Sequence, residues 1–459
     1  MSIQLIEHVN VDTSSDDITT IKIYTNKNLE KIPQIHHIPK QILFDIKVVS
    51  LVLPFRVNNY VLSELIDWKK VPNDPMFQLT FPNKDMLTSE HYEEIACAIR
   101  QNSSKPALDN IIKRIRTTLN PHPAGQLEKN IPMVDDKYLD GIQHKYDQTV
   151  LFFPAAGQTC HSYCTFCFRW AQFIDDYDLK IAAKEVEELM HYLRDKPFIT
   201  DVLITGGDPM VMKARYIKAY LEPFLSEELD HIKNIRIGTK SLSFWPQRFV
   251  SDADADDLLE LFKRVKEKGK NIALMAHYNH FKELDTPVAV QAIKRIQSTG
   301  VTIRSQGPLL KHINDDVETW AKLWQKQIAL GIVPYYMFVE RDTGAKKYFE
   351  VPLYKAWSIY QQAIQKVGGL SRTVRGPSMS TDPGKVEVLG TNKVNGEKVF
   401  ILRFIQARDP DWAYRPFFAK YSETATWLND LKPLEGNTFF FEQVMKVSSM
   451  YNRDMNRSK

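Results

Sequence analysis

The chain has 459 residues, of which 43% are hydrophobic, 11% aromatic and 25% charged. These proportions are typical of a globular protein with a large core, and they exclude a disordered chain, a collagen-like repeat and a small disulfide-bonded domain. The 60 lysines and arginines outnumber the 56 acids so slightly that the formal charge is +4, too small a bias to predict nucleic-acid binding.

The N-terminal residues MSIQLIEHVNVDTSSDD contain acids and have neither a cationic start nor an apolar run. No signal or transit peptide is therefore predicted. No segment approaches the roughly 18 consecutive apolar residues of a transmembrane helix. We expect a cytoplasmic protein whose partners include neither a membrane nor a nucleic acid.

Residues 1–140 are predicted to form an N-terminal extension that is mostly helical. Its helix-like segments are 60–68, 89–102 and 108–119, and its strand-like segments are 18–25 and 47–55. The sequence PHPAG at 121–125 ends the last helix, because proline lacks a backbone N–H and biases the preceding residue toward extended backbone.

Residues 141–370 alternate short apolar runs with longer amphipathic segments. The apolar runs are 149–155, 201–208, 234–240, 271–277, 301–307 and 333–339. Helical periodicity is clear between them at 182–195, 254–269, 288–300 and 316–331. Such βα units require a parallel sheet with right-handed crossovers, and six of them with polar strand ends favour an α/β fold of the partial or full barrel type. A doubly wound open sheet is the alternative.

Residues 371–459 have a different texture. The segments 373–390, 398–406 and 437–445 are typical of strands and turns. We therefore expect a β-rich C-terminal cap.

Three of the four cysteines, Cys160, Cys164 and Cys167, fall within eight residues directly after the first core strand. Barrel enzymes place their chemistry in loops at this end of a strand. Three close thiolates in a reducing compartment suit an iron–sulfur cluster better than a disulfide, and a [4Fe–4S] cluster on three cysteines leaves one iron open to a small molecule. A zinc site completed by Cys97 or His161 is the alternative, although Cys97 is interpreted as a buried small apolar residue.

The C-x3-C-x2-C pattern, with Tyr163 before its second cysteine, resembles the radical S-adenosylmethionine superfamily. The resemblance implies that the open iron binds the amino and carboxylate groups of S-adenosylmethionine. One-electron cleavage would then give a 5′-deoxyadenosyl radical that takes a hydrogen from the substrate, with a low-potential donor such as flavodoxin or ferredoxin as a partner. Gly206, Gly207 and Asp208 resemble the superfamily's strand-end motif, whose backbone meets the methionyl amino group.

The chain more closely resembles the lysine 2,3-aminomutase family, in six segments in the same order. These are 144–153, 201–211, 236–248, 275–280, 304–315 and 334–338. The resemblance implies a partial (β/α)6 radical SAM barrel between the N-terminal extension and the cap. It also implies a 2,3-aminomutase that uses pyridoxal phosphate and acts on a free amino acid. His277 and Gln306 would contact the adenosyl moiety, unless they merely cap barrel strands.

Family resemblance also suggests which residues bind pyridoxal phosphate. Lys385, in the sequence Asp-Pro-Gly-Lys, would bind the cofactor covalently through its amine, although the glycine stretch is shorter than in the family. A solvated strand lysine is the alternative interpretation of Lys385. Lys145 and Tyr146 fall where the family has an arginine–tyrosine pair near the cofactor phosphate.

On the substrate side, Arg169 falls where the family binds the α-carboxylate, and the alternative is that it offsets the charge of the cluster. Lysine-specific members hold the distant ammonium with two acids. An ungapped alignment places Arg341 at the first acidic position and Asp382 at the second. Arg341 suits an acidic or polar side chain better than lysine, so the substrate is left open.

The family's C-terminal cysteines, which help to bind zinc at a subunit interface, are absent after Cys167. Dimerisation by that zinc site is therefore in doubt, and a homo-oligomer would need other contacts. Two further classes stay open. One is a radical SAM epimerase, dehydrogenase or peptide-modifying enzyme without pyridoxal phosphate, and the other is a cluster-containing regulator without enzymatic activity.

Overall fold

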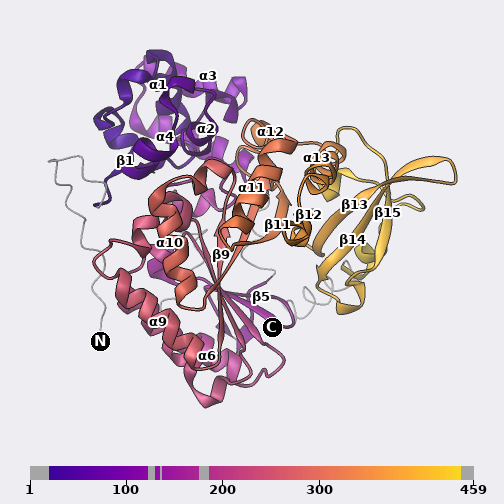
Figure 1. Cartoon of the computed structure of the whole chain (residues 1–459). Coiled ribbons are helices and arrows are strands. Elements are labelled where there is room, and N and C mark those ends of the chain that lie inside the picture. The colour runs from indigo at the N-terminus through magenta and orange to yellow at the C-terminus, as the bar shows by residue number, and fades with distance from the viewer. Residues whose placement is uncertain (1–19, 122–129, 135–136, 175–185, 446–459) are drawn as a thin grey trace.

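The computed structural model describes residues 20–121, 130–134, 137–174 and 186–445. Along the chain these form a helical N-terminal module, a central sheet flanked by helices and a C-terminal β-rich cap (Figure 1). In the view of Figure 1 the module lies above the sheet, and the strands of the cap extend to the right.

In its described residues the N-terminal module combines four α-helices with a small antiparallel sheet. Its elements are β1 (Ile23–Thr25), α1 (Lys40–Val49), β2 (Arg56–Asn58), α2 (Pro75–Thr80), α3 (Ser89–Arg100) and α4 (Lys105–Leu119). The helices predicted at 89–102 and 108–119 are confirmed as α3 and α4. Of the helix-ending sequence at 121–125, residues 122–125 lie outside the described residues.

Two sequence predictions in this module are wrong. The segment 47–55 is not a strand, because Lys47–Val49 is the last turn of α1. Val48 and Val49 are fully buried there, so packing overrides the β propensity of a β-branched pair. The segment 60–68 is not a regular α-helix but a π-helical turn (Val61–Leu65) followed by a 3-10 turn that begins at Trp68.

The core and the cap share one eleven-stranded sheet, in which the strands stand side by side in chain order. The strands are β5 (Ile142–Tyr146), β6 (Thr149–Phe152), β7 (Asp201–Ile204), β8 (Asn234–Thr239), β9 (Asn271–His277), β10 (Thr302–Leu309), β11 (Val333–Val339), β12 (Arg375–Ser380), β13 (Gly384–Val394), β14 (Glu397–Ala407) and β15 (Pro416–Lys420). Pairing is parallel from β6 to β12, and antiparallel for β5 at one edge and β13–β15 at the other. All six predicted core strands are confirmed as β6 to β11. A separate two-stranded antiparallel sheet is formed by β3 (Met133–Val134) and β4 (Lys137–Tyr138).

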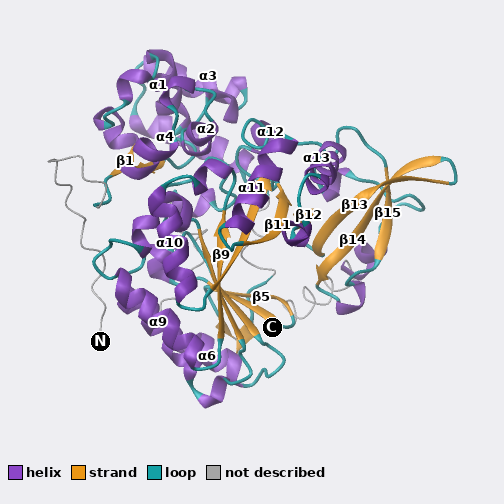
Figure 2. Ribbon diagram, viewed as in Figure 1, coloured by secondary structure: helices purple, strands orange, loops and turns teal. Residues whose placement is uncertain are grey.

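Helices follow the parallel strands (Figure 2). Those predicted at 182–195, 254–269, 288–300 and 316–331 are confirmed as α6 (Glu187–Arg194), α9 (Ala255–Glu267), α10 (Pro287–Ser298) and α11 (Val317–Ala329). The structure adds α7 (Ala214–Leu221), α8 (Ser241–Phe244), α12 (Lys346–Phe349) and α13 (Leu353–Gln365). The first four residues of the helix predicted at 182–195 lie outside the described residues.

The two faces of the parallel sheet differ in chemistry. On one face Ile235, Ile237 and Leu274 are buried in the same apolar cluster as residues of α9 and α10. On the other face Arg236 and His277, which alternate with them, are only half-buried. A doubly wound sheet would reverse its strand order and cover both faces with helices. The unbroken strand order and the polar second face in the described residues therefore contradict that alternative.

The cap continues the core sheet rather than standing apart from it. The strands predicted within 373–390 and 398–406 are confirmed as β12, β13 and β14, whereas β15 was not predicted. The prediction that 437–445 is strand and turn is wrong at residues 440–445, which are helical. There Phe439 and Phe441 pack against Phe417 of β15, so the aromatic run fills the core of the cap instead of joining a sheet.

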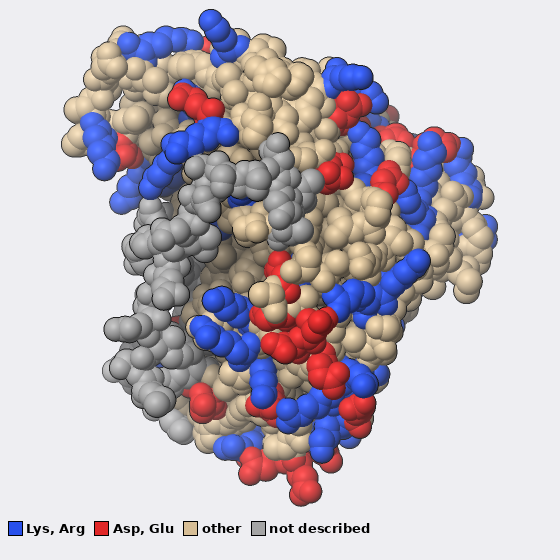
Figure 3. Space-filling view, turned by 60° about the vertical axis from the view of Figure 1, so that its left-hand side comes forward, with Lys and Arg blue, Asp and Glu red and all other residues tan. Residues whose placement is uncertain are grey.

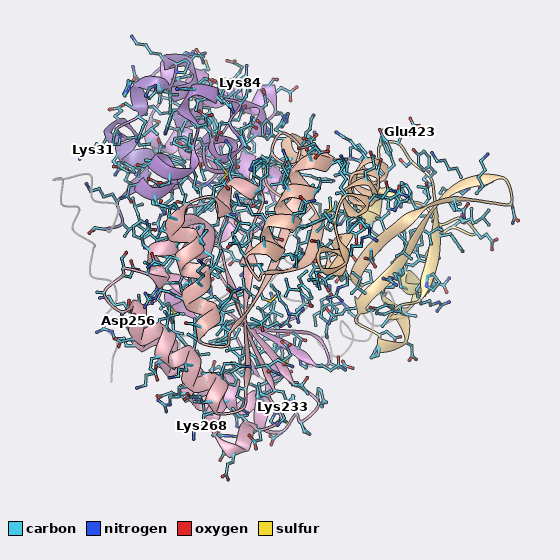
Figure 4. The ribbon with its side chains drawn as sticks, in the orientation of Figure 1. Lys31, Lys84, Lys233, Asp256, Lys268 and Glu423 are labelled. Atoms are coloured by element: carbon cyan, nitrogen blue, oxygen red, sulfur yellow. The ribbon has the colours of Figure 1, made fainter. Side chains whose placement is uncertain are left out.

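Charged side chains lie mainly on the outer surface. On the face shown in Figure 3, lysines and arginines are interspersed with aspartates and glutamates. The charged residues labelled in Figure 4 come from all three parts of the chain and lie at its periphery. In the described part of the chain, no helix is both long enough and apolar enough to cross a membrane.

Candidate active site

The three clustered cysteines lie in the loop after β6, at the carboxyl end of the parallel strands, and all three are half-buried free thiols. Burial raises the pKa of each thiol, in the case of Cys167 to about 11. The thiols therefore hold their protons until a metal replaces them. Cys97 is exposed on α3, so the prediction that it is buried is wrong: it lies on the solvent side of that helix, between the buried Ala96 and Ala98.

Gly206 and Gly207, after β7, let the start of the cysteine loop approach the sheet closely. A Cβ atom on Gly206 would lie 2.2 Å from the side chain of Gln158, and one on Gly207 would lie 2.4 Å from the carbonyl oxygen of Thr159. Gly206 also has a φ of +152°, which L side chains rarely adopt. A larger residue at Gly207 would have to displace the backbone of the loop, whereas at Gly206 it would displace the side chain of Gln158 and strain the backbone.

Asp208 is part of a buried network that joins β7, β8 and the cysteine loop. Its carboxylate accepts hydrogen bonds from Thr239 Oγ1 (2.7 Å) and Ser241 Oγ (2.9 Å), as well as from two backbone N–H groups. Ser241 Oγ in turn lies 2.9 Å from Nδ1 of His161 in the cysteine loop. The carboxylate of Asp208 therefore positions protein groups, and the sequence motif did not indicate this role.

His277 and Gln306, the predicted adenosyl contacts, are paired in register; His277 is the last residue of β9, whereas Gln306 lies inside β10, which continues to Leu309. The ring of His277 stacks on Phe166 of the cysteine loop, with ring centroids 5.6 Å apart. Burial lowers the pKa of His277 well below its ordinary value, so its imidazole is neutral. The side chain of His277 therefore lies beside the loop, and Gln306 is its neighbour on the adjacent strand.

The predicted substrate residue Arg169 lies at the inner edge of the cysteine loop. Its Nη1 donates to the carbonyl oxygen of Gly206 (3.1 Å), and its guanidinium lies 4.2 Å from the ring centroid of Phe153. Its Nε is buried and has no hydrogen-bond partner among the described residues. Burial lowers its pKa to about 10, which leaves it charged at neutral pH.

Lys145 lies on the edge strand β5, and Lys385 lies on β13, which is flanked by β12 and β14 near the other end of the strand order. The amine of Lys385, on β13, lies 4.2 Å from the ring centroid of Tyr336, and burial together with Arg236 and Arg375 lowers its pKa to about 7. The amine of Lys145, on β5, donates to the carbonyl oxygen of Thr381. Burial, Arg408 and Arg341 lower the pKa of Lys145 to about 7 as well.

The remaining predicted residues join the same group. The guanidinium of Arg341, just after β11, lies over the ring of Phe168 (4.8 Å), and its charge is felt by Arg169, Lys145 and Tyr146. Asp382 is exposed and forms an ion pair with Arg408 (3.0 Å). The structure thus brings together residues 145, 169, 341 and 385, which are far apart in the sequence.

No protein-family model matches the chain. A protein of Aquifex aeolicus (strain VF5), provisionally named L-lysine 2,3-aminomutase, is 32% identical over 400 residues, which cover 87% of this chain and 93% of that protein. The chain belongs to the L-lysine 2,3-aminomutase family. Two further relatives have lower identity. The L-lysine 2,3-aminomutase of Bacillus subtilis (strain 168) is 28% identical over 51% of this chain and 47% of its own. The glutamate 2,3-aminomutase of Clostridioides difficile (strain 630) is 28% identical over 41% and 42%.

Two solved structures overlap only loosely with the chain. SuiB of Streptococcus suis gives a TM-score of 0.35 at 16% identity and covers 63% of this chain and 60% of its own. A radical SAM methyltransferase from Sphaerobacter thermophilus gives 0.36 at 15% identity and covers 61% and 86%. TM-scores this low carry no information about the fold beyond the strand order described above.

Membership confirms the resemblance inferred from the sequence. The chain is an enzyme of the radical SAM isomerase class, and this class uses a [4Fe–4S] cluster and S-adenosylmethionine. The three cysteine thiols fit a [4Fe–4S] cluster, because they lie on one loop whose start approaches the sheet closely at Gly206 and Gly207. No group of three or more His, Cys, Asp and Glu among the described residues converges on a single metal ion. A cluster needs no such convergence, because each thiolate binds a different iron.

The site also fits an anionic cofactor and substrate, because its cations outnumber its accessible acids.

Sequence reasoning missed two groups here. Glu340, after β11, is buried beside Cys167 with a pKa well above its ordinary value, and the hydroxyl of Tyr278, after β9, is buried with no partner among the described residues. Both residues directly follow an apolar strand segment, and this position was the sequence feature that could have identified them.

Proposed function

We propose that the enzyme is a pyridoxal-phosphate-dependent radical 2,3-aminomutase whose substrate is a free amino acid with an acidic side chain. The main support is Lys385, a half-buried lysine whose pKa is lowered to about 7 within a group of cations. An amine that attacks a carbonyl must be neutral, and desolvation beside other cations is the usual way to make it so. When bound, the cluster and S-adenosylmethionine supply a radical, and pyridoxal phosphate supplies the π system through which nitrogen migrates.

The proposal gives each residue of the group a separate role. Cys160, Cys164 and Cys167 would hold the cluster, and Gly206, Gly207, His277 and Gln306 would line the place of S-adenosylmethionine. Lys145 and Tyr146 would bind the cofactor phosphate. Arg169 would hold the α-carboxylate, for which a planar guanidinium provides two parallel donors. Its unpartnered Nε suits this role.

Arg341 supports an acidic substrate. It is half-buried, and in the described residues it has neither an ion pair nor a side-chain hydrogen bond. A second carboxylate would satisfy it, whereas the ammonium of lysine would be repelled. Asp382 aligns with the second acid that holds the ammonium in lysine-specific members. It forms an ion pair with Arg408, so its carboxylate already has a cationic partner within the protein.

Three further expectations belong to the same proposal. We infer that the parallel strands form the partial (β/α)6 radical SAM barrel, that the enzyme works in the cytoplasm and that a low-potential donor such as flavodoxin or ferredoxin reduces it. The chain order of the strands and the polar inner face support the barrel.

Borohydride trapping tests the role of pyridoxal phosphate. The anaerobically reconstituted enzyme is incubated with pyridoxal phosphate, reduced and mapped by peptide mass spectrometry. The label is expected on Lys385 and is lost in Lys385→Ala. If S-adenosylmethionine is still cleaved but no lysine is labelled, the enzyme without pyridoxal phosphate, such as an epimerase or dehydrogenase, replaces this proposal.

Turnover of glutamate, aspartate and lysine tests the substrate. An acidic amino acid is expected to be converted to its β-isomer in preference to lysine. Arg341→Gln should lower kcat/KM for that substrate by about 10- to 150-fold, since a hydrogen bond to a charged group is worth about 1.5–3 kcal/mol. Unchanged turnover in this variant, or preference for lysine, would contradict an acidic substrate.

A further inference from the structure

The N-terminal module contacts the cysteine loop through its strand β2. The backbone N–H of Tyr163 donates to the carbonyl oxygen of Arg56 (2.8 Å). The backbone N–H of Asn58 donates to Ser162 Oγ (3.1 Å), and its side chain donates to the carbonyl oxygen of Phe244 beyond β8 (2.8 Å). The loop is therefore held between the module and the sheet.

The side chain of Arg56 makes the most direct of these contacts. Its Nη1 donates to Thr159 Oγ1 (2.7 Å) and to the carbonyl oxygen of Cys160 (3.2 Å). Its guanidinium lies 5.0 Å from the ring centroid of Tyr163, and its Nε is buried with no hydrogen-bond partner among the described residues. One side chain thus spans the first half of the cysteine loop.

Cations act on all three cysteines of the loop, and Arg169 interacts with Cys160 as well as with Cys167. Arg56 acts electrostatically on Cys160, Lys240 acts on Cys164 and Arg169 acts on Cys167. Lys240 forms an ion pair with the buried Glu283 (2.6 Å), which offsets its charge. Arg169 is assigned above to the substrate carboxylate. Arg56 has no ion pair in the described part of the chain, and no role in the proposed reaction.

We propose that Arg56 is a positioning residue that the N-terminal module contributes to the cluster site: it fixes the turn at Thr159 and Cys160, and its charge favours the reduced cluster. Reduction adds one negative charge to the cluster, and a fixed positive charge nearby stabilises the more negative state. A unit charge about 10 Å away in an effective dielectric of about 20 shifts such an equilibrium roughly tenfold. The inference needs the cluster but not pyridoxal phosphate, so it can fail or succeed independently of the proposed aminomutase reaction.

The test is a dithionite titration of the reconstituted full-length enzyme, followed by electron paramagnetic resonance of the reduced cluster, with iron content measured in parallel. Arg56→Gln should lower the midpoint potential by about 59 mV, which is a tenfold change for a one-electron couple. Arg56→Lys, which keeps the charge, should restore most of it. Arg116→Gln is the matched control, because Arg116 is a half-buried arginine of the same module that donates to the carbonyl oxygens of Leu51 and Val52 instead of to the loop.

A merely structural role for Arg56 would lower iron content without moving the potential of the cluster that remains. An unchanged potential in Arg56→Gln, or an equal shift in Arg116→Gln, overturns the proposal. If Arg56→Gln retains no cluster, Arg56→Met, a neutral side chain of similar length, is compared with Arg56→Lys. A lower potential in Arg56→Met supports the proposal, and equal potentials in these two variants overturn it. Loss of the cluster in Arg56→Lys as well, where the charge is kept, also overturns the assigned role of the charge.

Discussion

The charge of Lys385 should change near neutral pH rather than in the alkaline range of an ordinary lysine. Burial and the charges of Arg236 and Arg375 lower its pKa from 10.5 to about 7. At pH 7.5 a lysine with a pKa of about 7 is neutral in about three quarters of molecules, against about one in a thousand for an ordinary lysine. The reactive fraction is therefore about 700-fold larger.

Competitive labelling with acetic anhydride measures this directly. The enzyme without pyridoxal phosphate is labelled from pH 5 to pH 10, and the peptide that contains Lys385 is quantified by mass spectrometry. Its labelling should rise with a midpoint near pH 7, because a lysine becomes reactive as it loses its proton. The chain denatured in urea supplies the ordinary profile as a control. A midpoint near pH 10 in the native enzyme would refute both the desolvation of Lys385 and its role as the cofactor lysine.

Three further predictions concern other parts of the site. Cys167→Ala should lose the cluster, whereas Cys97→Ala should keep the iron content of the wild type, because Cys97 is exposed on α3; equal loss in both would reject the three-cysteine site. Gly207→Ala should destabilise the fold by about 1–3 kcal/mol in urea unfolding, because its Cβ would meet Thr159, whereas Gly368→Ala, with open space around it, should not. Binding of inorganic phosphate at pH 8 should be accompanied by proton uptake, because an anion beside Lys145 raises the pKa of its amine, which is about 7 without the anion. Calorimetry in buffers of different ionisation enthalpy measures this uptake. Proton release would contradict the placement of Lys145 at a phosphate site.

The sequence was a reliable guide to the parallel core. Each core strand is a short apolar run whose alternate residues are buried under helices, so the pattern reflects the same burial that the fold produces. It failed where packing within a module decides the structure. Val48 and Val49 look like strand residues but end a helix, and the aromatic run at 439–441 fills the cap instead of extending its sheet.

The site was only partly predictable, for a related reason. The cysteine loop is a local pattern, so Cys160, Cys164 and Cys167 could be identified from spacing alone. The approach of Lys145 to Lys385 joins strands that lie far apart in the strand order, the edge strand β5 and β13, and only the family resemblance suggested it. No local pattern indicated that Arg56 would reach the cysteine loop, because its contact with Thr159 joins residues 103 positions apart.

All three parts of the chain contribute to the candidate site. The N-terminal module supplies Arg56, the core supplies the cysteine loop and Arg169, and the cap supplies Lys385. Each of these cations is at least partly removed from water, which costs free energy that a bound anion or a reduced cluster would recover. Binding of the cofactors should therefore stabilise the contacts between the parts as well as each part alone. The N-terminal module and the cap therefore both line one site, and the stability of their contacts with the core depends on what that site binds.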